Sequence, residues 1–431
     1  MKFPVWKNLD LQWKILISIA MGLVAGMILN RIQSGTEFSF QSIRAILQLG
    51  GDVFIRLLSM LIVPLVFSSI YMSIVRLGTF QELKKMGTAT GLYYLMTTAL
   101  AVLVGMMLVN LIHPGAGFDS ETVEQLKQNM AVPERIIEEG VDKKNAVMII
   151  LETLVRMIPA NPIAAMANAD ILQVIFFTIV FAIISAMVGK QSAPLVQLID
   201  SLDQIMIRAV MIIMNIAPYC IFMLVTVLMM DLGFQAIFAL SKYTITVICG
   251  LFIHAFITLP LLVFLLGKVH PFRLFKAMLP AILTAWSTAS SVATLPLTLD
   301  CLEKRAGIPR KIGNFVLPLG ATVNMDGTAL YESVAAIFIA ELLGYPMNFG
   351  VQVIIFITAT LAAIGAAAIP GAGLVTMGIV LTAAGLPLEG IGLILAIDRI
   401  LDQFRTAVNV WGDATAGVVV FRKNHALKNN L

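Results

Sequence analysis

Residues 398–413 read Asp398-Arg399-Ile400-Leu401-Asp402-Gln403-Phe404-Arg405-Thr406-Ala407-Val408-Asn409-Val410-Trp411-Gly412-Asp413, inside an otherwise apolar segment of about 391–420. On a helix the polar members recur at three- and four-residue steps and share one face: Asp398, Asp402, Arg405, Thr406, Asn409 and Asp413. One charged side chain at the centre of a membrane helix costs about 2.5–3.5 kcal/mol even on a lenient scale. Such a stripe persists only where it faces protein, water or ions, so it predicts a polar binding site at membrane depth. The alternative is an internal ion-pair network that only holds helices together.

The composition is that of a polytopic membrane protein. The 431 residues are 59% hydrophobic and 13% charged, with a mean hydropathy of +0.93, whereas soluble domains carry about 25% charged residues. The net charge of +4 comes from basic residues in short loops, a pattern typical of membrane orientation and not of nucleic-acid binding. The three cysteines are scattered, so they indicate neither a disulfide framework nor a metal-binding pair.

The ends of the chain are basic, which predicts that both termini are cytoplasmic. The residues concerned are Lys2, Lys7 and Lys14 at one end, and Arg422, Lys423 and Lys428 at the other. The first apolar run continues into further spans, so no cleavable signal is expected. We expect a multi-pass protein of the cell (inner) membrane, in contact with the lipid bilayer.

Six apolar segments precede the last third of the chain, and each is long enough to span a membrane. They cover about 13–32, 53–75, 87–112, 146–188, 205–229 and 243–266. The fourth is too long for one span, and Pro159-Ala160-Asn161-Pro162 is predicted to break it. The loop at 119–145 has seven acidic and four basic residues. Because it lacks a basic bias, it is expected on the outer side.

The segment at about 277–299 is flanked by basic clusters on both sides. A single span cannot return to the same side, so this pattern predicts a re-entrant helical hairpin with its tip at Ser290-Ser291. The next segment, about 312–343, contains Asn324-Met325-Asp326-Gly327-Thr328. An Asp between Asn, Gly and Thr is a poor helix interior, so this run predicts an unwound break whose carbonyls face a cavity.

A second re-entrant hairpin is predicted at about 349–386, cut by the small residues 366–373 and entering from the opposite face. The order hairpin, span, hairpin, span is typical of inverted repeats around a site at the membrane midplane. The expected fold class is therefore an all-α polytopic membrane protein with eight transmembrane helices and two re-entrant helical hairpins.

The run 324–328 and the polar helix 398–413 resemble the dicarboxylate/amino acid:cation symporter family. That family includes archaeal aspartate transporters, bacterial glutamate symporters and mammalian excitatory amino acid transporters. The resemblance covers nearly the whole chain and includes Ser290-Ser291 with Thr294-Leu295-Pro296, Ile369-Pro370-Gly371-Ala372-Gly373, Tyr93 to Thr98, and Pro159-Ala160-Asn161-Pro162. It implies the glutamate-transporter fold and a transporter, not an enzyme, with no organic cofactor.

The resemblance also implies a role for each substrate residue. Asp402 matches the carboxylate that accepts the substrate ammonium, and Arg405 matches the guanidinium that clamps an acidic side chain. A bidentate guanidinium suits a carboxylate for physical reasons as well. The remaining implied substrate residues are Ser290, Ser291, Thr328, Ile369, Gly373, Thr406 and Asn409, of which the hairpin members would act through backbone amides.

Three cation sites follow from the same resemblance. The first maps onto Gly320, Asn324, Asn409 and Asp413, the second onto Tyr94, Thr97, Thr98, Asn324 and Asp326, and the third onto backbone carbonyls near Thr322, Met325, Ala363, Ile364 and Ala366. Hard cations prefer oxygen ligands, and every side chain named offers one. Sodium is therefore the coupling ion that we expect. The alternative is that the Thr and Tyr hydroxyls only satisfy local backbone groups or form an interfacial belt.

The sequence departs from the family in two places. In much of the family an arginine occupies the first hairpin tip or the position two before the clamp arginine, whereas here these positions are Ala289 and Gln403. Glu332 matches a glutamate that takes a proton in the mammalian branch, where it is linked to potassium countertransport. Glu332 is thus the candidate for proton coupling, while the absent second arginine argues against a full potassium cycle.

The expected function is symport of glutamate or aspartate into the cell, driven by a sodium gradient, with elevator-type alternating access in a homotrimer. The predicted division is 1–86 scaffold, 87–112 span of the transport domain, 113–232 outer loop and scaffold, 233–276 a further transport span, and 277–431 transport core. Alternatives within the family are a purely proton-driven symporter, a neutral amino acid carrier and a C4-dicarboxylate carrier. An ion channel would need rings of charge, and a membrane hydrolase would need a nucleophile–base pair. His254 has no such partner evident in the sequence and is interpreted as a packed core residue.

Overall fold

The computed structural model describes residues 11–35, 41–75, 84–116, 151, 155–232, 234–365 and 372–428, and within these ranges it is helical without strands. The acidic loop at 119–145 lies outside the described residues. By length and composition, five helical segments of the described chain could cross a membrane: Trp13–Ile32, Gln41–Val75, Gly87–Ile112, Ile171–Asp231 and Phe238–Gly267. Many large apolar side chains on these helices are exposed, among them Met107 and Phe252. These exposed faces suit lipid contact.

A first group of helices packs together: α2 (Leu11–Gly35), α3 (Gln41–Val75), α8 (Ile171–Val188) and α9 (Ala193–Leu232). Helix α3 begins well before the predicted residue 53. The reason is a long-range ion pair, in which Arg44 donates to both carboxylate oxygens of Asp231 at 2.9 and 2.8 Å. This pair ties the polar first turns of α3 to the end of α9.

The predicted break in the fourth segment is present. Residues 157–161 are not helical, and the short helix α7 (Pro162–Ala167) that follows is separated from α8 by a second interruption at 168–170. Asn161 begins α7 because its side chain accepts hydrogen bonds from the backbone N–H groups of Ile163 and Ala164. Pro162 occupies the first helical position, where its missing N–H costs nothing.

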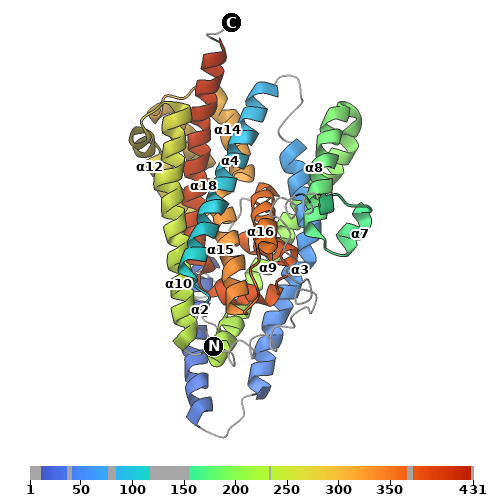
Figure 1. The fold of residues 1–431 in the computed structure, drawn as a ribbon, viewed down its shortest axis with the longest axis vertical. Helices are drawn as coiled ribbons and strands as arrows, with labels where there is room; N and C mark the ends of the chain where they lie inside the picture. The colour runs from blue at the N-terminus through green and yellow to red at the C-terminus, as the bar shows by residue number, and fades with distance from the viewer. Residues whose placement is uncertain are drawn as a thin grey trace, which may run out of the picture.

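A second group surrounds α15 (Asp326–Leu342). Every residue from Asp326 to Ala340 is buried, and α15 contacts α4 (Lys84–Ile112), α10 (Phe234–Ile253), α16 (Phe349–Ala362), α17 (Ala372–Ala383) and α18 (Ile391–Lys428). A helix buried on all sides belongs to the core. In Figure 1, α10, α12 (Pro271–Thr288) and α18 lie together on one side of the molecule, with α3, α7 and α8 on the other.

The first predicted hairpin is formed by α12 and α13 (Ser291–Asp300), which contact each other. Ala289 reverses the chain between them in the left-handed conformation, with φ of 49°. Ser290 then caps α13, because its hydroxyl accepts a hydrogen bond from Ala293 N–H at 3.2 Å. The predicted tip at Ser290-Ser291 therefore coincides with the observed turn.

The second predicted hairpin corresponds to α16, the short 3-10 turn η6 (Ala363–Gly365) and α17. Helices α16 and α17 contact each other, and their connection at 366–371 lies outside the described residues. The two groups of helices meet along several contacts, among them those of α17 and η6 with α3 and of α18 with α9. At this boundary a Cβ on Gly378 would lie 2.7 Å from Ile62 Cδ1. The division into scaffold and transport domains remains a prediction.

Candidate functional site

The polar face of α18 is buried in the protein. All six members of the predicted stripe are buried: Asp398, Asp402, Arg405, Thr406, Asn409 and Asp413. On the opposite face, Ile400 is 44% exposed. Helix α18 contacts α12, α14 (Arg310–Val323) and α15. The six stripe residues are buried as the helical spacing predicts, although Val408 and Val410 outside the stripe are buried as well.

The break predicted at 324–328 separates α14 from α15. Asn324 and Met325 leave helical geometry, with φ, ψ of −96°, 86° and −115°, 56°. The backbone N–H of Gly327 donates to Asn409 Oδ1 at 2.8 Å, which fastens the start of α15 to α18. A glycine is required here because a Cβ at this position would lie 2.7 Å from the carbonyl oxygen of Arg405.

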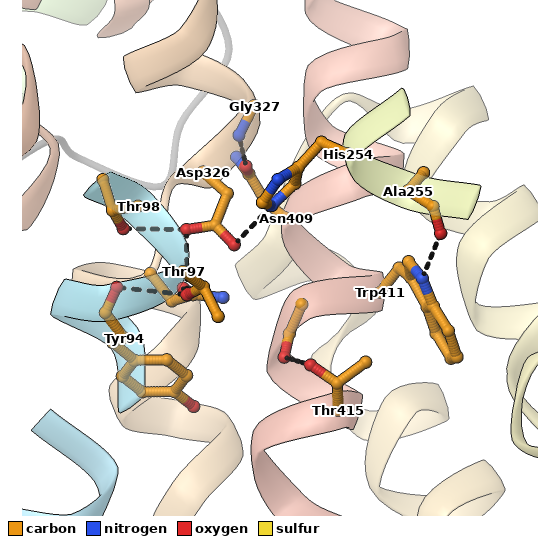
Figure 2. Close-up of polar contacts among 12 residues, drawn as sticks. Tyr94, Thr97, Thr98, His254, Ala255, Asp326, Gly327, Asn409, Trp411 and Thr415 are labelled. Carbon is orange, nitrogen blue, oxygen red and sulfur yellow. Dashed lines mark hydrogen bonds and ion pairs between the residues drawn. The ribbon is translucent and has the colours of Figure 1, made fainter. Parts of the chain in front are cut away.

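Asp326, the first residue of α15, lies at the centre of a buried polar cluster (Figure 2). Its Oδ1 accepts a hydrogen bond from Thr98 Oγ1 at 2.7 Å and lies 3.2 Å from Thr97 Oγ1. The Thr97 hydroxyl is also 3.2 Å from Asn324 Oδ1 and 3.1 Å from the carbonyl oxygen of Tyr94. Residues from α4, the helix break and α15 are thus brought together as oxygen donors around one carboxylate.

A second carboxylate lies next to this cluster. Asn324 Nδ2 donates to Asp413 Oδ1 at 2.9 Å. Gly320 on α14 faces the same carboxylate, since a Cβ there would lie 2.3 Å from Asp413 Oδ1 and 2.5 Å from Tyr94 Oη. Asn324 therefore connects Asp413 with the Asp326 cluster, and hard cations favour such oxygen-rich surroundings.

Arg405 is a buried cation between α18, α15 and the start of α17. Its Nη2 lies 3.0 Å from both Asp398 Oδ1 and Asp402 Oδ1, and its Cζ lies 3.9 Å from the ring centroid of Tyr331. Gly373 is close, since a Cβ there would lie 2.7 Å from Arg405 Nη1. Among the described residues, Nε and Nη1 of Arg405 have no hydrogen-bond partner. These buried donors are suited to an anionic ligand.

Comparison with known proteins agrees with this arrangement. A sequence model of the sodium:dicarboxylate symporter family matches residues 11–423. The chain belongs to this family. It is therefore a multi-pass membrane transporter and not an enzyme.

Curated relatives of this symporter occur in animals and bacteria. An excitatory amino acid transporter of Caenorhabditis elegans is 37% identical, with 95% of this chain and 86% of the relative aligned. Human excitatory amino acid transporter 5 is 37% identical over 94% of this chain and 80% of its own length. A proton/sodium-glutamate symport protein of Bacillus caldotenax is 32% identical over 96% of this chain and 94% of its own length.

The structure of the symporter brings some of the remaining predicted site residues into this region. Asn409 Nδ2 lies 3.5 Å from Thr328 Oγ1, and Thr328 in turn lies against Met325 Sδ. Thr406 Oγ1 donates to the carbonyl oxygen of Asp402 within α18. Among the described residues, Thr322 Oγ1 bonds within its own helix, to the carbonyl oxygens of Leu319 at 3.0 Å and Pro318 at 3.4 Å.

The hairpin residues are placed less completely. Ser291 is buried at the start of α13, which contacts α18, and the ring of Trp286 near the same tip lies 6.2 Å from the ring of Phe404. Ala363 and Ile364 lie in η6, which contacts α14 and α15. Ile369 and Ala366 lie outside the described residues. The roles of all these residues remain predictions.

Glu332 is fully buried on α15. Its Oε1 accepts a hydrogen bond from Thr376 Oγ1 on α17, whereas no described residue bonds its Oε2. A carboxyl group shared between the core helix and the second hairpin suits the predicted proton role, because it can gain a proton without losing its one bond.

Sequence reasoning missed two residues of the site. Arg399 is buried, and its Nη1 donates to Asp402 Oδ2 at 3.1 Å. His254 is fully buried, and its Nε2 lies 3.1 Å from Asp326 Oδ2. The interpretation of His254 as a packed core residue agrees with its burial, but its contact with Asp326 was not predicted. Arg399 was visible in the sequence, three residues before Asp402. No spacing connects His254 with Asp326, because their contact depends on the tertiary fold.

Proposed function

We propose that this symporter takes up glutamate or aspartate together with sodium ions. The observation that carries the proposal is that an oxygen-rich cluster and a pair of opposite charges lie next to each other at the α14–α15 break. Asp326, Asn324 and Asp413 gather oxygen donors on one side, and Arg405 with Asp402 presents paired charges on the other. A zwitterionic diacid and a hard cation are the ligands that complement these two sets.

The proposed substrate site has a positive group for the side-chain carboxylate of an acidic amino acid and a negative group for its ammonium. The unused Nε and Nη1 donors of Arg405 would bind the side-chain carboxylate, and Asp402 would accept the ammonium group. Thr328, Thr406 and Asn409 are the nearby polar groups for the other carboxylate. Backbone amides of the hairpin tips, at Ser290-Ser291 and from Ile369 to Gly373, would complete the shell.

On the cation side, one ion would be bound by Tyr94, Thr97, Thr98, Asn324 and Asp326. A second would be bound by Gly320, Asn324, Asn409 and Asp413, and a third by backbone carbonyls near Thr322, Met325, Ala363, Ile364 and Ala366. The bond from Gly327 N–H to Asn409 Oδ1 supports coupling of ions to substrate. An ion that orders the break also orders the Asn409 side chain, and any such coupling is reciprocal.

Glu332 would add a proton to the cycle. The proposal is supported by its burial and by the hydrogen bond from Thr376, the one bond that the described residues give its carboxyl group. The bacterial relative named as a proton/sodium-glutamate symport protein is consistent with this addition. Replacing Glu332 by Gln should leave sodium-driven uptake intact and remove its dependence on an imposed pH gradient.

Transport would follow an elevator-type movement of the α15-centred group against the first helix group, within a homotrimer of the cell (inner) membrane with cytoplasmic termini. The division of the helices into two groups, which meet along α3 with α17 and α9 with α18 among other contacts, is the feature on which this movement is proposed. Native mass measurement should give three times the 46.7 kDa chain mass. A single-chain mass would contradict the trimer.

Uptake into vesicles containing the purified protein tests the function. Radiolabelled L-aspartate and L-glutamate should accumulate under an inward sodium gradient without a pH gradient. Accumulation only under a pH gradient would favour the proton-driven alternative. Uptake of succinate or alanine in preference to aspartate would favour a C4-dicarboxylate or neutral amino acid carrier.

A further inference from the structure

The helix that continues α10 widens at His254–Thr258 into a π-turn, η3. Within it, Leu259 N–H bonds the carbonyl oxygen of His254, five residues back. In an α-helix the carbonyl oxygen of Ala255 would accept a hydrogen bond from Leu259 N–H, and in a π-turn from the N–H of residue 260. Leu259 N–H is already bonded to His254, and Pro260 has no N–H, so this carbonyl oxygen has no helical donor. Pro260 thus accounts for both the widened turn and a freed backbone acceptor.

Trp411 on α18 occupies that acceptor. Its Nε1–H donates to the carbonyl oxygen of Ala255 at 2.9 Å, and both groups are buried (Figure 2). The next residue, Gly412, lies against the cation cluster, since a Cβ there would lie 3.1 Å from Asp326 Oδ2. One turn of α18 therefore fastens the π-turn and approaches the Asp326 carboxylate at the same time.

His254 is the first residue of this π-turn and supplies the other bond to that carboxylate. Its Nε2 lies 3.1 Å from Asp326 Oδ2, while Thr97 and Thr98 approach Oδ1. Its Nδ1 has no hydrogen-bond partner in the described part of the chain. With a proton on Nε2, the ring donates to Oδ2 and holds the carboxylate in one orientation.

We propose that His254 is a positioning residue for the cation-binding carboxylate of Asp326. The π-turn, held by the hydrogen bond from Trp411, sets the distance between His254 and Asp326. The inference rests on the proposed role of Asp326 in cation binding. Groups that orient metal ligands typically contribute about 10–100-fold to metal affinity. His254 acts on the ion through Asp326 and does not itself bind the ion.

The test compares three variants in vesicles and in detergent. His254→Phe keeps a ring but has no donor, His254→Gln keeps an N–H donor, and Trp411→Phe keeps a ring but frees Ala255. The measured quantities are the sodium concentration that half-saturates L-aspartate uptake and the melting temperature in sodium chloride against choline chloride. His270→Phe, an exposed position without a side-chain cap bond, is the control.

His254→Phe should raise the half-saturating sodium concentration about 10–100-fold, and His254→Gln should restore most of the loss. Trp411→Phe should give an intermediate rise. The half-saturating aspartate concentration at saturating sodium should stay unchanged in all three, which a general folding defect would not allow. Wild-type sodium dependence in both His254→Phe and Trp411→Phe would overturn the positioning role of His254 and leave the proposed function standing. A wild-type protein insensitive to sodium would overturn the proposed function as well.

Discussion

At the scale of single residues, the charge of Arg405 is the least expected feature of a buried membrane helix. Its two ion-pair partners, Asp398 and Asp402, lie on the same helix. These pairs do not by themselves fasten α18 to another element, so the alternative of a purely structural ion-pair network explains them poorly. A ligand-binding role would account for both the burial and the Nε and Nη1 donors, to which no described residue bonds.

Arg405→Lys should keep the charge but lose the bidentate geometry and the stacking on Tyr331. Loss of one charge-assisted hydrogen bond of about 2 kcal/mol corresponds to roughly 30-fold weaker aspartate binding. Arg405→Ala should abolish binding. Arg310→Ala, which removes an exposed arginine paired with Glu303, is the matched control. Equilibrium binding of radiolabelled aspartate measures the affinity of each variant. An unchanged aspartate affinity in Arg405→Ala would refute the role of Arg405 in binding the substrate carboxylate.

Asp326→Asn should keep the shape of the Asp326 side chain and remove its charge. Since the remaining cluster ligands are neutral hydroxyl, amide and carbonyl oxygens, we expect the half-saturating sodium concentration to rise about 100-fold or more, by analogy with charged hydrogen bonds of about 3 kcal/mol. Asp300→Asn removes a carboxylate that pairs with Lys304 at the surface and is the control. The measurement is aspartate uptake at rising sodium concentration. Equal curves for Asp326→Asn and wild type would exclude this carboxylate as a sodium ligand.

The sequence could predict those site residues that helical spacing or a local break makes visible. The stripe from Asp398 to Asp413 follows from periodicity alone, and it is buried as expected. The contact of His254 with Asp326 could not be predicted, because 72 residues separate them and a π-turn sets their approach. Trp411, which the spacing could not explain, is accounted for only by the carbonyl that Pro260 leaves free.

At the scale of elements, breaks were easier to predict than helix starts. The α12–α13 turn and the α14–α15 break both follow from residues that terminate helices locally. The start of α3 at Gln41 was missed, because its polar first turns are stabilised by Asp231 on a distant helix. Helix ends that depend on contacts with distant helices cannot be predicted from the local sequence.

The close approach of α14 to α18 and α4 gives a prediction for Gly320→Ala. The new Cβ would lie 2.3 Å from Asp413 Oδ1 and 2.5 Å from Tyr94 Oη. Tyr94 Oη is held by its bond to the carbonyl oxygen of Val316 at 2.9 Å. Overpacking of this kind costs about 1–3 kcal/mol, so the melting temperature in detergent should fall by several degrees and sodium affinity should weaken.

Gly91→Ala is the matched control for that measurement. It lies on α4, the helix that carries Tyr94, and a Cβ there meets no atom within 4 Å. Its melting temperature should stay equal or rise slightly, because alanine is favoured over glycine in helices. If both alanine variants melted like the wild type, the tight contact at Gly320 would not matter for stability.

At the scale of the whole molecule, elevator-type transport requires the two helix groups to move relative to each other. A disulfide-forming cross-linker can test this in a background without Cys220, Cys249 and Cys301. The pair Ile62→Cys with Gly378→Cys joins α3 to α17 across the boundary, where the two positions are in contact. Cross-linking should reduce uptake at least about tenfold, since a tethered boundary prevents the movement between states, and a reductant should restore it.

A second cysteine pair inside the first group controls for the chemistry. Gly51 on α3 faces Leu224 on α9, where a Cβ would lie 2.3 Å from Leu224 Cδ2. Gly51→Cys with Leu224→Cys should cross-link without loss of uptake. Full uptake by the cross-linked Ile62–Gly378 pair would contradict movement of α17 against α3.

We expect ions and substrate to bind in adjoining sites and to stabilise each other's binding. The most direct measurement is the dissociation constant of L-aspartate for the purified protein at rising sodium chloride, with choline chloride holding the ionic strength constant. We expect aspartate to bind at least about tenfold more tightly for each tenfold rise in sodium, and Asp326→Asn to flatten this dependence. An aspartate dissociation constant that is the same in sodium and in choline would contradict this expectation.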